Sequence, residues 1–408
     1  MIVRDATVGA MAYDVDALRA RFPSLGATAH FDSPGGSQVP AAVADAVRVA
    51  LTSSLANRGR VTAAERAADH IVTEARRAMA DLLAADPSGV VFGRSSTQLT
   101  YDFARALAKT WRPGDEVVVT RLDHDANVRP WVQAAEAVGA VVRWAGFDPA
   151  TGELTPDDVA EQLSDRTRLV AVTGASNLIG TRPPVADIAA LAHRGGALLF
   201  VDAVHLAAHR PVDLAALGAD LLVCSPYKFF GPHCGVLAGR PEVLADLRPD
   251  KLLPSGDAVP ERFELGTLPY ELLAGCTATV DFIAGIAPVG ADRRARVVSS
   301  LEAVAEHEDR LRARVEAGLA ELPGATVWSR AELRTPTLLV TFADRDPAEA
   351  YRFLATLDVN APAGSFYALE TSRWLGLGDA GGLRVGLAAY STDAEVDRLL
   401  DGLGRFLR

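Results

Sequence analysis

The chain has 408 residues, of which 49% are hydrophobic and 23% charged, with three cysteines and a formal net charge of -11. A chain of this length is longer than one hydrophobic core normally stabilises, so we expect two domains. The net negative charge argues against a general binder of nucleic acids or anionic membranes. The cysteines form no CxxC pair, no apolar run approaches the roughly 20 residues of a membrane span, and residues 1–12 lack a signal-peptide pattern, so we expect a cytoplasmic protein.

Apolar and amphipathic stretches alternate along the first 240 residues. Two helices are expected between residues 40 and 83, separated by a break at 57–60. Short apolar runs then predict strands at 90–92, 116–120, 141–144, 169–173, 198–202, 220–225 and 235–238. Amphipathic stretches predict helices at 97–109, 130–138, 156–163 and 184–193. Continuous apolar strands with helices between them indicate a mostly parallel sheet covered on both faces.

The last third of the chain has a different pattern. A long helical stretch at 292–322 precedes a set of shorter elements, predicted as strands at 337–341 and 382–387 and helices at 347–357 and 392–406. We therefore expect three regions. These are an N-terminal segment (1–30) that packs with the small domain, a large domain (31–285) and a small α+β domain (286–408).

Two residues with chemical potential stand at the ends of apolar runs. Lys228, one of only three lysines, closes the run 219–227 and precedes two phenylalanines. Burial lowers the pKa of an amine, and the neutral amine is the form that attacks an aldehyde. Asp202 ends another apolar run, where a carboxylate can keep a pyridinium nitrogen protonated. Either residue alone is more often a solvated lysine or a helix-capping aspartate, but together they are the minimal signature of a pyridoxal phosphate enzyme.

Further polar residues follow other predicted strands. Ser96, His124 and Asn177 lie just past strand ends, as Asp202 and Lys228 do. Ligands of parallel sheets bind at the carboxyl ends of the strands. We therefore expect these five side chains to meet in one site.

Motifs spread over nearly the whole chain resemble those of the class V aminotransferases, which are fold-type I pyridoxal phosphate enzymes, and most closely their cysteine desulfurase-like branch. The motifs that carry this resemblance are the segments 31–36, 92–97, 123–127, 175–181, 201–205, 225–228, 264–267 and 384–392. The resemblance implies an α/β fold with a mostly parallel, seven-stranded-type sheet in the large domain and a smaller α+β C-terminal domain. It also implies pyridoxal 5'-phosphate as cofactor and a small amino acid as substrate.

The resemblance further implies the residues of the site. The expected catalytic residues are Lys228, His124 and Asp202. The expected cofactor-binding residues are Ser96, Thr97, His124, Asn177, Asp202, His205, Ser225, Tyr227, Lys228 and Thr267. The expected substrate-binding residues are Arg384, Asn177 and Arg58, with the Arg384 guanidinium gripping the substrate carboxylate. Thr267 resembles a residue that contacts the phosphate of the neighbouring subunit, which implies a homodimer with shared active sites.

His205 stands where the family frequently has a glutamine beside the phenolic oxygen of the cofactor. A neutral imidazole can make the same hydrogen bond. His205 and His209 have a spacing seen in metal sites, but no third ligand accompanies them, so we expect no metal.

The chain departs from cysteine desulfurases at residues 359–367. In those enzymes a mobile loop carries the cysteine that takes sulfur from the substrate as a persulfide, whereas this stretch contains no cysteine. We therefore expect an enzyme that acts through an external aldimine and a quinonoid, with Cβ–S lysis or another β-elimination as the favoured reaction. Transamination and epimerisation stay open as alternative reactions. An alternative from another class of protein is a catalytically idle, cofactor-binding interaction protein.

Overall fold

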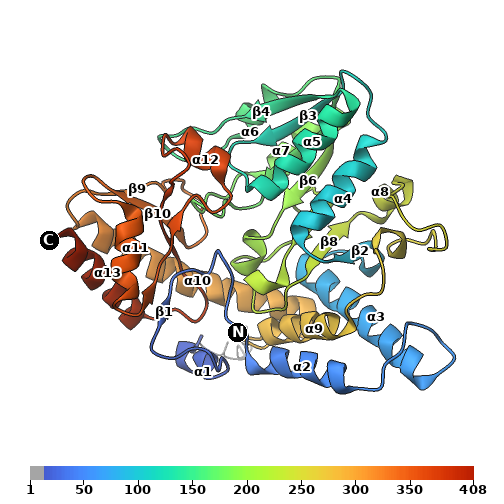
Figure 1. Cartoon of the computed structure of the whole chain (residues 1–408), viewed down its shortest axis with the longest axis horizontal. Coiled ribbons are helices and arrows are strands. Elements are labelled where there is room, and N and C mark those ends of the chain that lie inside the picture. Colours follow the sequence, from blue (N-terminus) through green and yellow to red (C-terminus); the bar gives the residue numbers. More distant parts are fainter. Residues whose placement is uncertain (1–12) are drawn as a thin grey trace, which may run out of the picture.

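A seven-stranded sheet forms the centre of the larger part of the molecule (Figure 1). The computed structural model describes residues 13–408. The strand order is β2-β8-β7-β6-β5-β3-β4, and neighbours are parallel except at β8, which runs antiparallel to both β2 and β7. The strands are β2 (Val90–Gly93), β3 (Glu116–Thr120), β4 (Val141–Ala145), β5 (Thr167–Thr173), β6 (Leu198–Asp202), β7 (Leu221–Cys224) and β8 (Gly235–Gly239). The predicted mostly parallel sheet is confirmed.

Helices cover both faces of this sheet, and side-chain alternation along each strand divides its residues between two cores. In β3, Val117 and Val119 belong to the core of one face, whereas Val118 belongs to the core of the other. The first face is covered by α4 (Ser96–Ala108), α5 (Arg129–Val138) and α8 (Pro241–Asp246). The second face is covered by α3 (Ala63–Leu83), α6 (Pro156–Ala160), α7 (Val185–Arg194) and α9 (Tyr270–Ala284), with α2 (Ala41–Thr52) packed on α9.

A smaller antiparallel sheet lies beside the large one and has its own core. Its strand order is β12-β13-β10-β9. Its strands are β9 (Ala325–Val327), β10 (Thr337–Phe342), β12 (Ala363–Gly364) and β13 (Gly382–Gly386). The helices that pack with it are α10 (Arg293–Ala320), α11 (Pro347–Ala355) and α13 (Asp393–Leu407). Leu311, Leu338, Val385 and Leu399 meet in this core.

The N-terminal part of the described chain lies against the small sheet. Strand β1 (Ala29–His30) pairs in parallel with β11 (Val359–Asn360), and Phe31 is buried in the small-sheet core. The short helix α1 (Val15–Arg19) is held there by Arg19, whose Nη1 donates to the Tyr390 carbonyl at 2.6 Å. The boundaries at 30/31 and 285/286 stay predictions, and residues 1–12 of the expected N-terminal segment lie outside the described residues.

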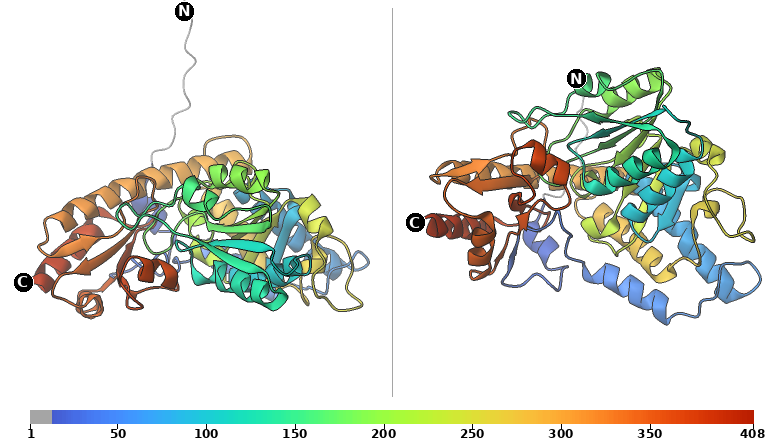
Figure 2. Two further views of the ribbon diagram at one scale, coloured as in Figure 1. Left: turned by 90° about the horizontal axis from the view of Figure 1, so that it is seen from above. Right: turned by 45° about the horizontal axis from the view of Figure 1, so that its top comes forward.

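Two helices connect the two sheet regions. The long helix α10 packs with α3 and α9 at one side and with α13 and β9 at the other (Figure 2). The short helix α12 (Leu369–Trp374) belongs to the C-terminal part but reaches back to the edge of the large sheet, where the Trp374 Nε1 donates to the Phe147 carbonyl at 2.7 Å. Within residues 13–408, no helix combines the length and apolar character needed to cross a membrane.

Candidate active site

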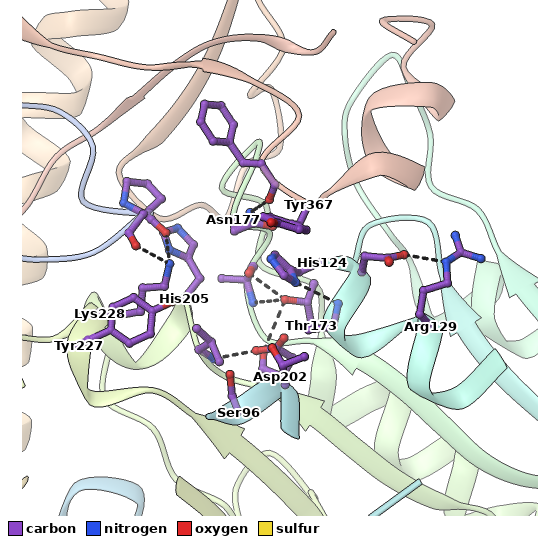
Figure 3. Close-up of a pocket in the computed structure, with 18 of the residues that line it drawn as sticks. Ser96, His124, Arg129, Thr173, Asn177, Asp202, His205, Tyr227, Lys228 and Tyr367 are labelled. Atoms are coloured by element: carbon purple, nitrogen blue, oxygen red, sulfur yellow. Dashed lines mark hydrogen bonds and ion pairs between the residues drawn. The ribbon is translucent and has the colours of Figure 1, made fainter. Parts of the chain in front are cut away.

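A cavity of about 620 Å³ opens at the carboxyl ends of the parallel strands, where the two sheet regions meet (Figure 3). Lys228 lies in the turn after β7, Asp202 ends β6, Asn177 follows β5, His124 follows β3 and Ser96 begins α4 after β2. Because these strands are parallel, their ends lie at one edge of the sheet. The cavity is lined by Pro34, Gly35, Ser96, Thr97, Tyr101, His124, Asp125, Ala126, Arg129, Thr173, Ala175, Asn177, Asp202, Val204, His205, Tyr227, Lys228, Phe366, Tyr367 and Arg384.

Most of the predicted site residues line this cavity. Ser225 lies directly behind the lining, and its hydroxyl is 2.9 Å from that of Ser96. Two further predicted residues also do not line the cavity of their own chain. Arg58 instead pairs through Nε with Asp69 at 2.9 Å and through Nη1 with Glu261 at 3.3 Å. Thr267 lies exposed in the segment before α9.

The Lys228 amine lies in the cavity and has a lowered pKa. Burial, and then the nearby Arg384, lower its pKa from 10.5 to about 7, while Asp202 opposes the shift. Its Nζ donates to the Pro34 carbonyl and, at 3.1 Å, to the Gly35 carbonyl, and it lies 4.9 Å from the centre of the Tyr227 ring. A substantial fraction of this amine is therefore neutral near pH 7.

Asp202 provides a carboxyl group in the same cavity. Burial raises its pKa to about 6, although a hydrogen bond from the Val204 amide at 2.8 Å and the charge of Lys228 both favour the ionised form. A cationic ring nitrogen next to this carboxyl would strengthen its ionisation, because an opposite charge stabilises a carboxylate.

Two histidines face the cavity in neutral form. Burial, then Lys228 and Arg384, lower the pKa of His124 to about 4, and its Nδ1 accepts from the Ala126 amide at 3.0 Å, so its proton is on Nε2. Burial, then the neighbouring His209, hold the pKa of His205 well below its usual value. The His205 Nε2 lies 2.9 Å from the Thr335 hydroxyl and 3.0 Å from the Thr337 hydroxyl.

The start of α4 lies at one end of the cavity, with Ser96 at the bottom of the view in Figure 3. The Ser95 hydroxyl caps the helix by accepting from the Gln98 amide at 3.1 Å, which leaves Ser96 and Thr97 in the first turn. The helix N-terminus favours a negative charge there. Gly235 permits this close packing, since a Cβ at that position would lie 2.3 Å from the Ser95 carbonyl carbon.

The opposite end of the cavity carries two polar atoms without partners. Arg384 is central in β13 and 2% exposed, and desolvation lowers its pKa to about 9. Its Nη1 donates to the Asn177 carbonyl at 3.1 Å, but among residues 13–408 its Nε and the Asn177 Oδ1 have no hydrogen-bond partner. A buried donor and a buried acceptor left open in one cavity are suited to a polar ligand.

The cavity also contains residues that the sequence did not single out, above all Arg129, Phe366 and Tyr367. Phe366 and Tyr367 occupy the stretch in which no cysteine was found. Tyr101, Asp125 and Thr173 were also missed. Three lining residues lie within motifs identified from the sequence, namely Pro34, Gly35 and Asp125. Their place in those motifs is the signal from which they could have been predicted.

The three cysteines lie away from the cavity lining but close to one another. The Sγ atoms of Cys234 and Cys276 are 3.3 Å apart, and Cys224 is buried in the same core. Burial raises the pKa of the Cys224 thiol, and the contact with Cys234 together with burial raises that of Cys276. Neither thiol is therefore readily ionised.

Comparison with known proteins places the chain in a family. The family model described as Aminotransferase class-V matches residues 29–399. The chain is 35% identical to the uncharacterized protein MT3887 of Mycobacterium tuberculosis, over 96% of this chain and 99% of that protein. It is 30% identical to a cysteine desulfurase of Dickeya dadantii, over 97% of each.

A solved structure agrees. The cysteine desulfurase CsdA of Escherichia coli superposes with a TM-score of 0.85 at 27% identity, over 97% of this chain and 98% of that one. The expected fold-type I architecture is confirmed. The chain belongs to the class V aminotransferases, and it is a pyridoxal phosphate-dependent enzyme of the cysteine desulfurase-like kind.

Proposed function

We propose that this enzyme cleaves a Cβ–S bond, or a related bond to Cβ, of a small α-amino acid by β-elimination and passes no sulfur to a cysteine of its own. The observation that carries this proposal is the composition of the cavity. Lys228, Asp202 and Arg384 face one space, while the segment that approaches it from the small-sheet region supplies Phe366 and Tyr367 in place of a thiol.

The residues of the cavity fit pyridoxal phosphate. Ser96 and Thr97 at the start of α4, together with Ser225 directly after β7, suit its phosphate, and the Asp202 carboxyl suits its ring nitrogen. His124 is available to stack on the face of the cofactor ring. His205, whose Nε2 contacts the Thr335 and Thr337 hydroxyls, has its Nδ1 available for the phenolic oxygen. When bound, this cofactor supplies an electron sink for negative charge at the α-carbon of the substrate.

Lys228 acts as nucleophile and then as base. A pKa of about 7 leaves enough neutral amine to bond covalently to an aldehyde. With the cofactor bound, the Lys228 Nζ would lie in the cavity beside the substrate and could remove the proton from its α-carbon. Loss of that proton precedes departure of the group on Cβ.

Arg384 and Asn177 orient the substrate. The open Nε edge of Arg384 suits a carboxylate, which a guanidinium binds through two parallel hydrogen bonds. The Asn177 Oδ1, which has no donor within the described part of the chain, can accept a hydrogen bond from the substrate. A fixed carboxylate limits rotation of the α-carbon relative to Lys228.

We further propose a homodimer in which Thr267 contributes to the partner's site. Thr267 is exposed and does not line the cavity of its own chain. Its neighbour Leu265 is 54% exposed, and Val49 and Leu51 on α2 are 53% and 65% exposed. Such apolar exposure is typical of surfaces that pack against another subunit.

Product analysis tests the proposed reaction. Purified protein with pyridoxal phosphate is incubated with L-cysteine, β-substituted alanines, L-alanine and L-serine, and keto acid, sulfide, ammonia and D-isomers are measured. The proposal expects keto acid, ammonia and sulfide or thiol in equal amounts from the sulfur substrates. Keto acid formed only with an amino acceptor would indicate transamination, and D-isomers would indicate epimerisation. No change with any amino acid would indicate an idle cofactor-binding protein.

A further inference from the structure

We propose that Phe366 is a positioning residue for Arg384. Its ring fixes the orientation of the guanidinium that receives the substrate carboxylate. An ion-pair cluster between the two sheet regions holds the ring in place. This inference rests on the proposed function, because it assumes an α-amino acid with a free carboxylate.

The Phe366 ring covers one face of the Arg384 guanidinium. The Arg384 Cζ lies 3.6 Å from the centre of that ring. An aromatic face attracts a cation, and the attraction is larger away from water. A guanidinium binds a carboxylate through its edge, so a ring on its face leaves the unpaired Nε free for the ligand. The stack therefore fixes the plane of the guanidinium without competing for the substrate.

The segment that carries Phe366 is fastened to the large-sheet region through its backbone. The Asn177 Nδ2 donates to the Phe366 carbonyl at 2.9 Å, and the Asp125 amide donates to the Tyr367 carbonyl at 2.7 Å. Phe366 and Tyr367 have φ values of 51° and 59°, in the left-handed region that residues other than glycine rarely adopt. Two consecutive residues keep such a conformation when their surroundings determine it, as the two hydrogen bonds do here.

Helix α12, directly after this segment, is held by an ion-pair cluster. The Glu370 carboxylate accepts from Arg121 Nη1 at 3.0 Å and from Arg129 Nη2 at 2.8 Å. Its side chain is 12% exposed, so these pairs are less screened than pairs on the open surface. The Arg121 Cζ also lies 4.7 Å from the ring centre of Trp374 in α12. Both arginines come from the large-sheet region, so the cluster ties the two regions together at the cavity.

The two arginines that line the cavity, Arg129 and Arg384, differ in how their charges are paired. Arg129 uses Nε on Asp125 at 2.9 Å and Nη2 on Glu370, so two carboxylates surround its charge. Among residues 13–408, the Arg384 side chain makes one hydrogen bond, to the Asn177 carbonyl, and its Nε has no partner. The substrate carboxylate is therefore expected at Arg384, beside Phe366.

Matched ligand pairs test the role of Phe366. The holoenzyme is titrated with L-cysteine and cysteamine, and with L-alanine and ethylamine, and binding is followed by the absorbance of the cofactor. Each amine lacks only the carboxylate of its partner. Phe366→Ala and Phe366→Leu are expected to weaken binding of both amino acids about thirtyfold, the size of a desolvated cation–π contact, and to leave amine binding unchanged. Phe366→Tyr, which keeps an aromatic face, is expected to restore amino-acid binding.

A second variant tests the cluster while Phe366 stays intact. Glu370→Ala is expected to increase hydrogen exchange of the backbone amides at residues 365–368 and to weaken amino-acid binding as Phe366→Ala does. Arg373→Ala is the matched control, because Arg373 lies on the same helix in an exposed pair with Asp379. It is expected to change neither exchange nor binding.

The outcomes separate this inference from the proposed function. Equal weakening of amino acids and amines by Phe366→Ala, or wild-type amino-acid binding in both Phe366→Ala and Phe366→Leu, overturns the positioning role alone. A wild-type holoenzyme that responds to no amino acid and no amine contradicts the proposed function, and the inference fails with it.

Discussion

Burial at the carboxyl edge of the sheet moves several ionisable side chains toward neutrality. The pKa of Lys228 falls to about 7 and that of Asp202 rises to about 6, each mainly through desolvation. Burial also raises the pKa of Asp123, the residue before His124, to about 8. Its carboxyl accepts a hydrogen bond from the Asn127 side-chain amide at 2.7 Å. Perturbed groups that share one cavity are typical of an active site.

The lowered pKa of Lys228 predicts how cofactor uptake depends on pH. Only the neutral amine reacts with an aldehyde, so the rate at which apoprotein takes up pyridoxal phosphate should rise with pH below about 7 and level off above it. Stopped-flow absorbance on the apoprotein measures this rate. A rate that keeps rising toward pH 10 would mean that Lys228 titrates like a solvated lysine.

Substitution of the two central residues should separate chemistry from folding. Lys228→Ala is expected to abolish turnover with the fold retained. Asp202→Asn is expected to retain cofactor and to lose at least about a hundredfold in kcat, because an amide cannot stabilise a charged ring nitrogen. Asp187→Asn, an exposed change in α7, is the matched control. Wild-type turnover in Asp202→Asn would reduce Asp202 to a structural role.

At the scale of elements, the strands of the large sheet were predictable because each is a continuous apolar run. The predicted ranges 116–120 and 198–202 coincide with β3 and β6. Helix α6 was expected to reach residue 163 but ends at Ala160, where a turn follows in which the Ser164 amide donates to the Thr167 hydroxyl at 2.9 Å. That local hydrogen bond competes with the helix.

Two of the elements that were missed are short strands that depend on pairing across the molecule. Strands β11 and β12 have two residues each, and their partners β1 and β13 are distant in sequence. Contacts between distant segments also explain which site residues were missed. Site residues that follow strand ends were predicted from their position in the sequence. Phe366 and Tyr367 line the cavity because of their positive φ values and because of contacts between the two sheet regions, which the sequence pattern does not show.

A buried ion pair should be a main stabiliser of the segment before α9. Arg76 in α3 donates to both oxygens of Glu264, at 2.8 and 2.7 Å, and the Phe92 amide donates to Glu264 Oε1 at 2.9 Å. Glu264→Ala leaves the buried Arg76 charge with only the longer contact to Glu261, at 3.5 Å, so it should lower the free energy of unfolding by about 3 kcal/mol, the low end of the range for a broken buried pair. Urea unfolding measures this. Arg77→Ala, which breaks the exposed pair with Glu74, should cost below about 1 kcal/mol.

At the scale of the whole molecule, the shared-site hypothesis predicts complementation. Thr267→Ala should weaken pyridoxal phosphate binding about tenfold, as expected for one hydrogen bond to a charged group. When Lys228→Ala and Thr267→Ala proteins are mixed under conditions of subunit exchange, each heterodimer should regain one complete site. Light scattering should give the mass of a dimer. A monomer with full activity, or no recovery after proven exchange, would contradict the shared site.

The most direct test of the account is the mass of the intact protein after turnover with L-cysteine. A β-elimination without an acceptor thiol predicts sulfide and keto acid in solution and no added mass on the enzyme. Replacing Cys224, Cys234 and Cys276 one at a time should leave the activity within a few-fold of normal, apart from losses of core packing. An added sulfur atom that maps to a cysteine, Cys234 in particular, and that an added reducing thiol removes as sulfide, would contradict the account and establish a persulfide mechanism.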